Sequence, residues 1–283
     1  MAQLTQFESL RGSTTMYEAF FHLRRRPFLA APSIDSYFPG QAIEHARQTL
    51  TRCIERAQGP GLVIGPAGTG KSLLCQLLAD HFRSALRVAV LANSRLCTRR
   101  ALLQSILFEL GQRYRDMDEG ELRLSLINYL EPSAECPNGV LLIVDEAHTY
   151  PTRLLEELRI LTNLVRDGVP RIRLVLAGGS PLEERFAGPK LESFNQRIAG
   201  RCYLQALNRD ETTQYVRAQL AAVDGDPDRI IADSAWAALY RATDGVPRLI
   251  NQICDAALLF AAQGGVGAVT DQIVEQAWAD LQQ

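Results

Sequence analysis

Residues 65–72 have the residue types and the spacing that bind phosphate. They match the pattern G-x-x-x-x-G-K-[ST] at every fixed position. Glycines let the backbone turn closely around a phosphate with its N–H groups pointing inward, and a following helix adds its positive N-terminal end. The residues that we expect to bind the phosphates of a nucleotide are Gly65, Pro66, Ala67, Gly68, Thr69, Gly70, Lys71 and Ser72. Lys71 would place its charge on the β and γ phosphates, and Ser72 would offer its hydroxyl to Mg²⁺.

Two carboxylates, Asp145 and Glu146, follow the apolar run Leu141–Val144. Such a run predicts a strand buried on both faces, and ligands bind at the carboxyl ends of the strands in open α/β sheets. We expect Asp145 to hold Mg²⁺ together with Ser72, and Glu146 to act as the base for an attacking water. His148 would either contact phosphate or cap the helix that follows, and we favour the cap.

The elements that must position these residues alternate between strands and helices up to about residue 207. We expect strands at Gly61–Ile64, Arg87–Ala92, Val140–Val144, Ile172–Ala177 and Gly200–Leu204. We expect helices at Gln41–Gln58, Gly70–Phe82, Thr98–Gly111, Glu119–Leu130 and Thr152–Arg166. This alternation predicts an α/β fold of three layers, in which helices cover both faces of a parallel sheet.

The strand pattern stops near Asn208, and the rest of the chain has helical spacing. We expect helices at Asp210–Val223, Asp233–Thr243, Pro247–Ala262 and Thr270–Leu281. Three parts follow: an N-terminal segment rich in aromatic residues and proline (1–40), a nucleotide-binding core (41–206) and a small all-α lid domain (207–283). Residues 17–40 are too apolar to stay in solvent, so we expect a short helix and an extended segment that packs on the main domain.

Composition and charge exclude several classes of protein. The formal net charge is −2 and 22% of the residues are charged, as in an ordinary globular protein without a strongly basic surface overall. The six cysteines are widely spaced with no CxxC pair, so we expect free thiols in a reducing compartment rather than a zinc site or disulfides. No apolar run approaches the ~20 residues of a membrane span, and no secretory signal is visible, so we expect a cytoplasmic protein.

The phosphate loop, the acidic pair and the C-terminal helices together resemble the AAA+ P-loop ATPases. Two further stretches narrow the resemblance to the ExeA-like (general secretion pathway protein A) family: Tyr17–Phe28, which reads YEAFFHLRRRPF, and Gly245–Asp255, which reads GVPRLINQICD. The resemblance covers about residues 16–280. It implies an AAA+ core with a helical lid, hydrolysis of ATP with Mg²⁺, and a homo-oligomer with shared active sites. It also implies secretion or pilus assembly proteins as partners.

The resemblance assigns roles to two arginines. Arg197 matches the family's Q-R-I segment before the last strand and would be the arginine finger that reaches the nucleotide of a neighbouring subunit, with Arg201 as the rival. Arg248 matches the sensor-2 arginine of the lid, which contacts the γ-phosphate. The family's first sensor is a polar residue after the fourth strand, but here Gly179 takes the expected position and Ser180 is the nearby polar residue. This departure predicts slow hydrolysis.

Two other functions fit the same motifs. A DNA-associated ATPase helper, of the transposition or origin-recognition kind, shares this core, and Arg24–Arg26 and Arg99–Arg100 are local basic runs. We favour a solvated face for Arg24–Arg26, because the net charge is negative and no helix-turn-helix pattern is present. A switch or scaffold that binds ATP with little hydrolysis is the third reading: Gly179 and Ser180 favour it, and the intact Glu146 opposes it.

Overall fold

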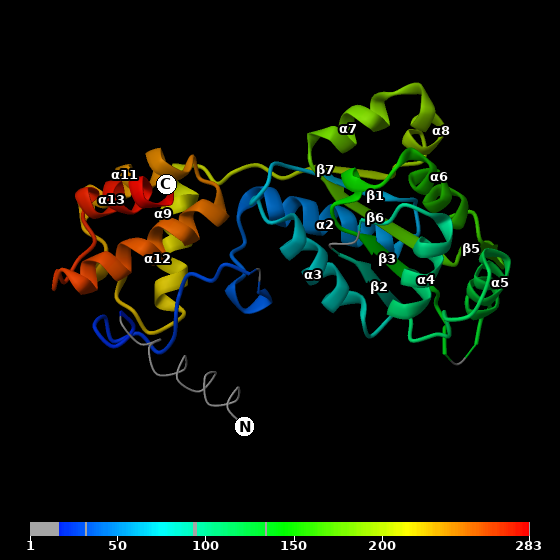
Figure 1. Cartoon of the computed structure of the whole chain (residues 1–283), viewed down its shortest axis with the longest axis horizontal. Coiled ribbons are helices and arrows are strands. Elements are labelled where there is room, and N and C mark those ends of the chain that lie inside the picture. The colour runs from blue at the N-terminus through cyan, green and yellow to red at the C-terminus, as the bar shows by residue number, and fades with distance from the viewer. Residues whose placement is uncertain (1–16, 32, 93–94, 134, 283) are drawn as a thin grey trace. The chain divides into compact units, whose positions relative to one another are not determined.

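In the computed structural model, residues 17–31, 33–92, 95–133 and 135–282 are described, and they divide into two units (Figure 1). The core unit comprises residues 41–205. The helical unit joins residues 17–40 to residues 206–282, which are distant in the sequence. Each unit has its own apolar core.

A five-stranded parallel sheet forms the centre of the core unit, and its strands lie in the order β2-β3-β6-β1-β7 (Figure 1). The strands are β1 (Gly61–Ile64), β2 (Arg87–Leu91), β3 (Val140–Val144), β6 (Ile172–Gly178) and β7 (Gly200–Tyr203). All four pairings are parallel. Every residue of β3 is buried, as expected for a strand with both faces covered. The predicted parallel sheet is confirmed.

Helices cover both faces of this sheet. They are α2 (Gln41–Glu55), α3 (Lys71–Phe82), α4 (Arg99–Glu109), α5 (Glu119–Tyr129), α6 (Thr152–Leu161), α7 (Ser180–Ala187) and α8 (Glu192–Asn195). Side chains of α2 and α3 form one apolar cluster, and those of α4 to α8 belong to another. The neighbours Leu62 and Val63 of β1 pack into different clusters, because successive side chains of a strand point to opposite faces.

The helix predicted at Thr152–Arg166 is too long, and this expectation was wrong. Helix α6 ends at Leu161, and an antiparallel hairpin follows, made of β4 (Val165–Arg166) and β5 (Val169–Pro170). Asp167 and Gly168 form its turn with φ values of 50° and 77°. An Asp-Gly pair between two short segments that each contain a valine, Val165 and Val169, favours such a turn over continuation of a helix. Helices α7 and α8 were not predicted.

The helical unit contains α9 (Arg209–Ala221), α10 (Pro227–Ile230), α11 (Asp233–Thr243), α12 (Pro247–Gln263) and α13 (Asp271–Leu281). A capping box opens α9, in which Asn208 accepts from the N–H of Glu211 and the Glu211 side chain accepts from the N–H of Asn208. Among the described residues, no helix is long and apolar enough to cross a membrane.

Residues 17–40 pack on the helical unit, not on the core unit as we had expected. Residues 17–22 form turns rather than a helix, and the short 3₁₀ helix η2 (Ile34–Ser36) is the one helical element of the described part of this segment. Tyr17, Phe21, Leu23 and Phe28 are buried in the apolar cluster of the helical unit. The Tyr17 hydroxyl also donates to Asp255 over 2.5 Å. Burial of these side chains offsets the lost helix hydrogen bonds.

Candidate active site

The loop between β1 and α3 forms a tight turn at the carboxyl end of β1. Gly68 and Gly70 have φ values of 81° and 99°, which glycine adopts without strain. A Cβ at Gly65 would lie 2.8 Å from the Leu204 carbonyl oxygen and 2.9 Å from the Thr69 hydroxyl. Glycine is therefore required at these positions by the shape of the loop itself. Helix α3 begins at once, with Lys71 as its first residue.

Lys71 is buried, with 6% of its surface exposed. Its Nζ donates to the carbonyl oxygens of Gly65 over 2.9 Å and of Pro66 over 2.8 Å. The Thr69 hydroxyl also donates to the carbonyl oxygen of Pro66, over 2.9 Å. These bonds hold the ammonium charge against the loop whose motif predicts phosphate binding.

Ser72 and Asp145 lie in contact, so the structure brings together two motifs that the sequence separates. The Ser72 hydroxyl donates to Oδ2 of Asp145 over 2.5 Å. Asp145 directly follows β3, its side chain is buried, and its Oδ1 accepts from the N–H of Glu146 over 2.9 Å. A hydroxyl beside a buried carboxylate is an oxygen donor set that suits Mg²⁺.

The donor set fits a metal that is shared with a substrate. Among the described residues, no three His, Cys, Asp or Glu side chains gather closely enough to hold a metal by themselves. Mg²⁺ is usually bound by one or two carboxylates together with water and substrate phosphates, rather than by a complete protein cage. Ser72 and Asp145 therefore fit Mg²⁺ bound with a nucleotide.

Glu146 has a left-handed backbone conformation, with φ 54° and ψ 35°. This conformation is uncommon for a residue other than glycine and is often found at functional sites. It ends the strand and turns the Glu146 side chain, which is about one-third exposed, toward His148: Oε2 lies 3.3 Å from Nδ1 of His148. A carboxylate at the sheet edge beside the P-loop is placed as a base for water would be.

His148 does not cap the helix that follows, as we had favoured, because the N-cap residue of α6 is Pro151. His148 lies instead in the 3₁₀ turn η3 (Ala147–Thr149). Its carbonyl oxygen accepts from Nη1 of Arg185 over 3.0 Å, and Nη2 of Arg185 reaches the Thr152 hydroxyl over 3.3 Å. Arg185 of α7 thus ties the turn after β3 to the next helix. No sequence signal indicated this role, because the partners lie more than 30 residues apart.

The end of β6 lies against the same turn. A Cβ at Gly178 would approach the N atom of His148 within 3.3 Å and the Leu182 side chain within 2.8 Å. Gly179 is the N-cap residue of α7 and Ser180 its exposed first residue. The segment predicted to hold the first sensor therefore offers a glycine and an exposed serine.

Arg197 lies at the opposite edge of the sheet from the P-loop. Residue 197 precedes β7, and the P-loop follows β1, its parallel neighbour, with Gly61 opposite Gly200 and Ile64 opposite Tyr203. Arg197 is exposed, and its Nη1 donates to Oδ1 of Asn163. The structure therefore does not bring Arg197 to the P-loop of its own core unit.

Arg201, the rival to Arg197, lies within β7 and is half-buried. Its Nη2 donates to Oδ1 of Asn195, and its Nη1 lies 4.0 Å from a carboxylate oxygen of Glu183. A nearby carboxylate offsets the charge that a finger must bring to a phosphate. This arrangement favours Arg197.

Arg248 belongs to the helical unit, and its place at the nucleotide stays a prediction. It is exposed in the first turn of α12. Gly245 shapes the preceding turn with φ 70°, and a Cβ there would lie 1.8 Å from the Leu207 carbonyl oxygen. A cation in the first turn of a helix is unfavourable by itself, since that end carries partial positive charge. A bound anion would therefore stabilise both Arg248 and the N-terminal end of α12.

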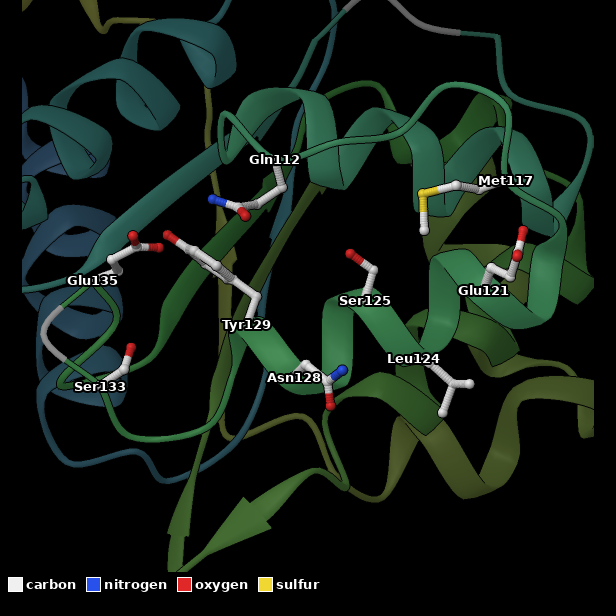
Figure 2. Close-up of a pocket in the computed structure, with 9 residues that line it drawn as sticks. All are labelled: Gln112, Met117, Glu121, Leu124, Ser125, Asn128, Tyr129, Ser133 and Glu135. Atoms are coloured by element: carbon white, nitrogen blue, oxygen red, sulfur yellow. The ribbon is translucent and has the colours of Figure 1, made fainter.

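The larger of the two pockets described, about 760 Å³, has no residue of the P-loop or of the acidic pair in its lining (Figure 2). Its lining side chains come from α5 and the loops around it, including Ser125, Asn128 and Tyr129. Its two carboxylates are Glu121 and Glu135, and no lysine or arginine lines it. Such a pocket lacks the positive charge that binds phosphate, so the P-loop remains the candidate site.

The strand order, the P-loop after β1 and the acidic pair after β3 define the class of the protein as an AAA-type P-loop ATPase fold. Comparison with protein families gives the same class, since residues 54–186 match the AAA domain. General secretion pathway protein A of Aeromonas hydrophila is 33% identical over 252 residues. These residues cover 88% of this chain and 46% of that protein, so the chain spans about half the length of this relative.

Solved structures share the fold at low sequence identity. Cdc6p from Pyrobaculum aerophilum matches with a TM-score of 0.70 at 17% identity, over 88% of this chain and 69% of that one. The ADP form of the Aeropyrum pernix ORC2 protein matches with a TM-score of 0.61 at 19% identity, over 84% and 67%. The RuvB Holliday junction branch migration motor of Thermotoga maritima matches with a TM-score of 0.59 at 18% identity, over 90% and 73%.

By sequence and by fold the chain belongs to the AAA-type ATPases. Its resemblance to the ExeA-like (general secretion pathway protein A) proteins, predicted from the motifs, is confirmed.

Proposed function

We propose that the protein binds Mg-ATP and hydrolyses it to ADP and phosphate. The observation that carries this proposal is the 2.5 Å contact between Ser72 of the P-loop and Asp145 after β3. This contact supports the proposal, because it brings two oxygen groups that suit Mg²⁺ beside the loop whose motif predicts phosphate binding, with Glu146 as the next residue. Proteins that bind nucleotide only as a scaffold have no need of a carboxylate base at this position.

Each residue has a task in this reaction. The loop amides of residues 65–70 and the Lys71 ammonium bind the β and γ phosphates, while Ser72 and Asp145 would hold Mg²⁺. When bound, Mg²⁺ offsets the negative charge of the phosphates. Glu146 accepts a proton from the water that attacks the γ phosphorus, and the bond to the oxygen of the β-phosphate breaks so that ADP leaves.

Arg197 and Arg248 would supply positive charge to the phosphoryl group in transfer. The place of Arg197 at the sheet edge opposite its own P-loop supports action on a neighbouring copy, in a homo-oligomer with shared sites. Arg248 would act from the helical unit on the γ-phosphate, where it would also relieve the unfavourable charge at the start of α12. The glycine and exposed serine at residues 179–180 lead us to expect slow turnover.

We further propose that turnover drives assembly or remodelling of a secretion or pilus-type complex in the cytoplasm. The similarity to general secretion pathway protein A supports this output. The solved relatives include RuvB, whose title names Holliday junction branch migration, but identities below 20% bear on fold alone. We therefore keep secretion as the proposal and DNA as an outcome of the test.

Steady-state ATPase activity of the wild type and of Glu146→Gln tests the reaction. We expect kcat to fall by about 10² or more while ATP binding is retained, because the amide cannot accept the proton. Glu55→Gln, the same change at an exposed residue of α2, is the matched control and should leave kcat unchanged. Equal rates for wild type and Glu146→Gln would overturn the catalytic assignment. Tight DNA binding at physiological salt would favour the DNA-associated function.

A further inference from the structure

We propose that Asn163 is a positioning residue that orients Arg197 toward the nucleotide of a neighbouring copy. This inference rests on the proposed function, in which Arg197 acts across a subunit interface. Its direct observation is the hydrogen bond from Nη1 of Arg197 to Oδ1 of Asn163, between residues 34 positions apart. Both side chains are exposed, so a neighbouring copy has access to them.

The acceptor atom, Oδ1 of Asn163, belongs to the turn directly after α6. Asn163 follows the last turn of α6, and its N–H donates to the carbonyl oxygen of Ile160 over 3.0 Å. Leu161 is buried in the apolar cluster beneath. Asn163 therefore lies in a turn that this hydrogen bond ties to the packed end of α6.

The backbone of Arg197 is fixed by other contacts. The N–H of Arg197 donates to Phe194 O over 2.9 Å, and the N–H of Ala199 donates to Pro60 O over 2.9 Å. Gly59 packs so closely that a Cβ there would lie 2.7 Å from the Arg197 carbonyl oxygen. What remains free to rotate is the long side chain, and ordering an arginine side chain costs conformational entropy. The Asn163 bond reduces that cost before the neighbour arrives.

A neutral amide suits this task better than a carboxylate. A guanidinium group has five N–H donors, and Asn163 accepts from Nη1, so the remaining edge can face a phosphate. The amide oxygen carries no full charge and leaves the positive charge of Arg197 intact. Arg201 has the corresponding amide partner in Asn195, but it also has the Glu183 carboxylate 4.0 Å away.

The pair lies beside a pocket of about 370 Å³ at the amino ends of the strands. Arg197 lines this pocket, as does Arg173. The half-buried guanidinium of Arg173 bonds to the backbone: Nε donates to Ile54 O over 2.9 Å and Nη1 to Asn138 O over 2.8 Å. The two arginines that line the pocket therefore differ. Arg197 is exposed and bonds to a side chain, whereas Arg173 bonds to backbone carbonyl groups.

The test compares ATP turnover of the full chain with single and double variants. We expect Asn163→Ala to lower kcat about fivefold with KM for ATP and thermal stability little changed, as for loss of one orienting hydrogen bond. Arg197→Ala should lower kcat further, and adding Asn163→Ala to it should have no additional effect. Asn195→Ala is the matched control, because it removes the equivalent amide from Arg201, and it should retain the wild-type rate.

Mixed oligomers provide the readout that a purely structural role would not give. An Asn163→Ala copy has an intact P-loop, and a Lys71→Ala copy has an intact Asn163–Arg197 pair. Mixing them should therefore raise turnover per intact P-loop toward the wild-type value, since the defect lies in the copy that donates the finger.

The outcomes separate the two proposals. If Arg197→Ala retains the wild-type rate, the finger of the proposed function is wrong, and this inference with it. If Arg197→Ala is slow but Asn163→Ala is not, the finger stands and the role of Asn163 is overturned. A defect of Asn163→Ala that persists in the Arg197→Ala background, or that mixing does not relieve, also overturns it.

Discussion

The hydroxyl of Ser72 donates to the carboxylate of Asp145 over 2.5 Å, although 73 positions separate them in the chain. The strand order explains this contact. Strand β6 lies between β1 and β3, and all three run parallel, so the P-loop after β1 and the acidic pair after β3 emerge at one sheet edge. The buried position of Asp145 leaves its carboxylate directed at the first turn of α3.

Removal of either partner should weaken the effect of Mg²⁺ on nucleotide binding. For Ser72→Ala and Asp145→Asn, we expect the Mg²⁺-dependent gain in ATP affinity to fall by about tenfold, because each variant lacks one oxygen ligand. Titration of a fluorescent ATP analogue with and without a chelator measures this gain. Ser193→Ala, at an exposed serine of α8, is the control. An unchanged Mg²⁺ dependence in both variants would contradict the assignment of these ligands.

Gly245 should be intolerant of any side chain. Gly245→Ala places a Cβ 1.8 Å from the Leu207 carbonyl oxygen at a φ of 70°, so we expect the free energy of unfolding to fall by about 3 kcal/mol or more. Gly265→Ala is a close control, because Gly265 has a φ of 67° with no atom within 4 Å, and backbone strain alone should cost about 1 kcal/mol. Urea unfolding compares the two variants, and equal losses would contradict this explanation.

Arg248 should favour activity at the expense of stability. Without nucleotide, Arg248→Ala is expected to stabilise α12 by about 0.5 kcal/mol, since it removes a cation from the positive end of the helix. The same variant should lower kcat. Arg241→Ala should instead lower stability, because Arg241 lies in the last turn of α11, where a cation is favourable. Thermal unfolding and ATPase assays of both variants measure these effects, and a destabilised Arg248→Ala would refute the prediction.

Tyr215 should make the helical unit sensitive to high pH. Burial raises the pKa of Tyr215 to about 12, and its hydroxyl donates to Asn251 over 2.7 Å. In the unfolded chain a tyrosine ionises near pH 10. The contribution of Tyr215 to stability is therefore complete below about pH 10 and is lost as the pH rises through about 12, for a total of about 3 kcal/mol.

Urea unfolding between pH 9 and pH 11 tests this dependence. Tyr215→Phe should show a shallower loss of stability with rising pH than the wild type. Tyr17 adds to the same trend, because burial and its hydrogen bond to Asp255 also raise its pKa. Parallel curves for wild type and Tyr215→Phe would contradict the prediction.

The parts of the fold that were predicted correctly depend on short stretches of sequence. The P-loop is eight consecutive residues with a strand before it and a helix after it, and the acidic pair ends a run of five apolar residues. In both motifs the neighbouring residues predict the strand or helix that positions the functional side chains. The strand and helix ranges follow in the same way, with ends that differ from the structure by a few residues.

The parts that were missed depend on distant residues. Tyr17 finds its partner Asp255 at a separation of 238 positions, and no local pattern in residues 17–40 indicates which unit they pack on. No local sequence pattern predicts the pairing of Asn163 with Arg197 either. The hairpin at residues 165–170 did carry a signal, the Asp-Gly pair, but the amphipathic spacing of α6 concealed it.

The helical unit is discontinuous in the chain, and this has a consequence for synthesis on the ribosome. Residues 17–40 are made first, but the helices that bury Tyr17 and Phe28 appear only after the 165 residues of the core unit, 41–205. At typical elongation rates this delay is on the order of ten seconds. We expect the apolar segment to wait, exposed, while the core unit folds, and a fragment that starts at residue 206 to need that segment supplied separately.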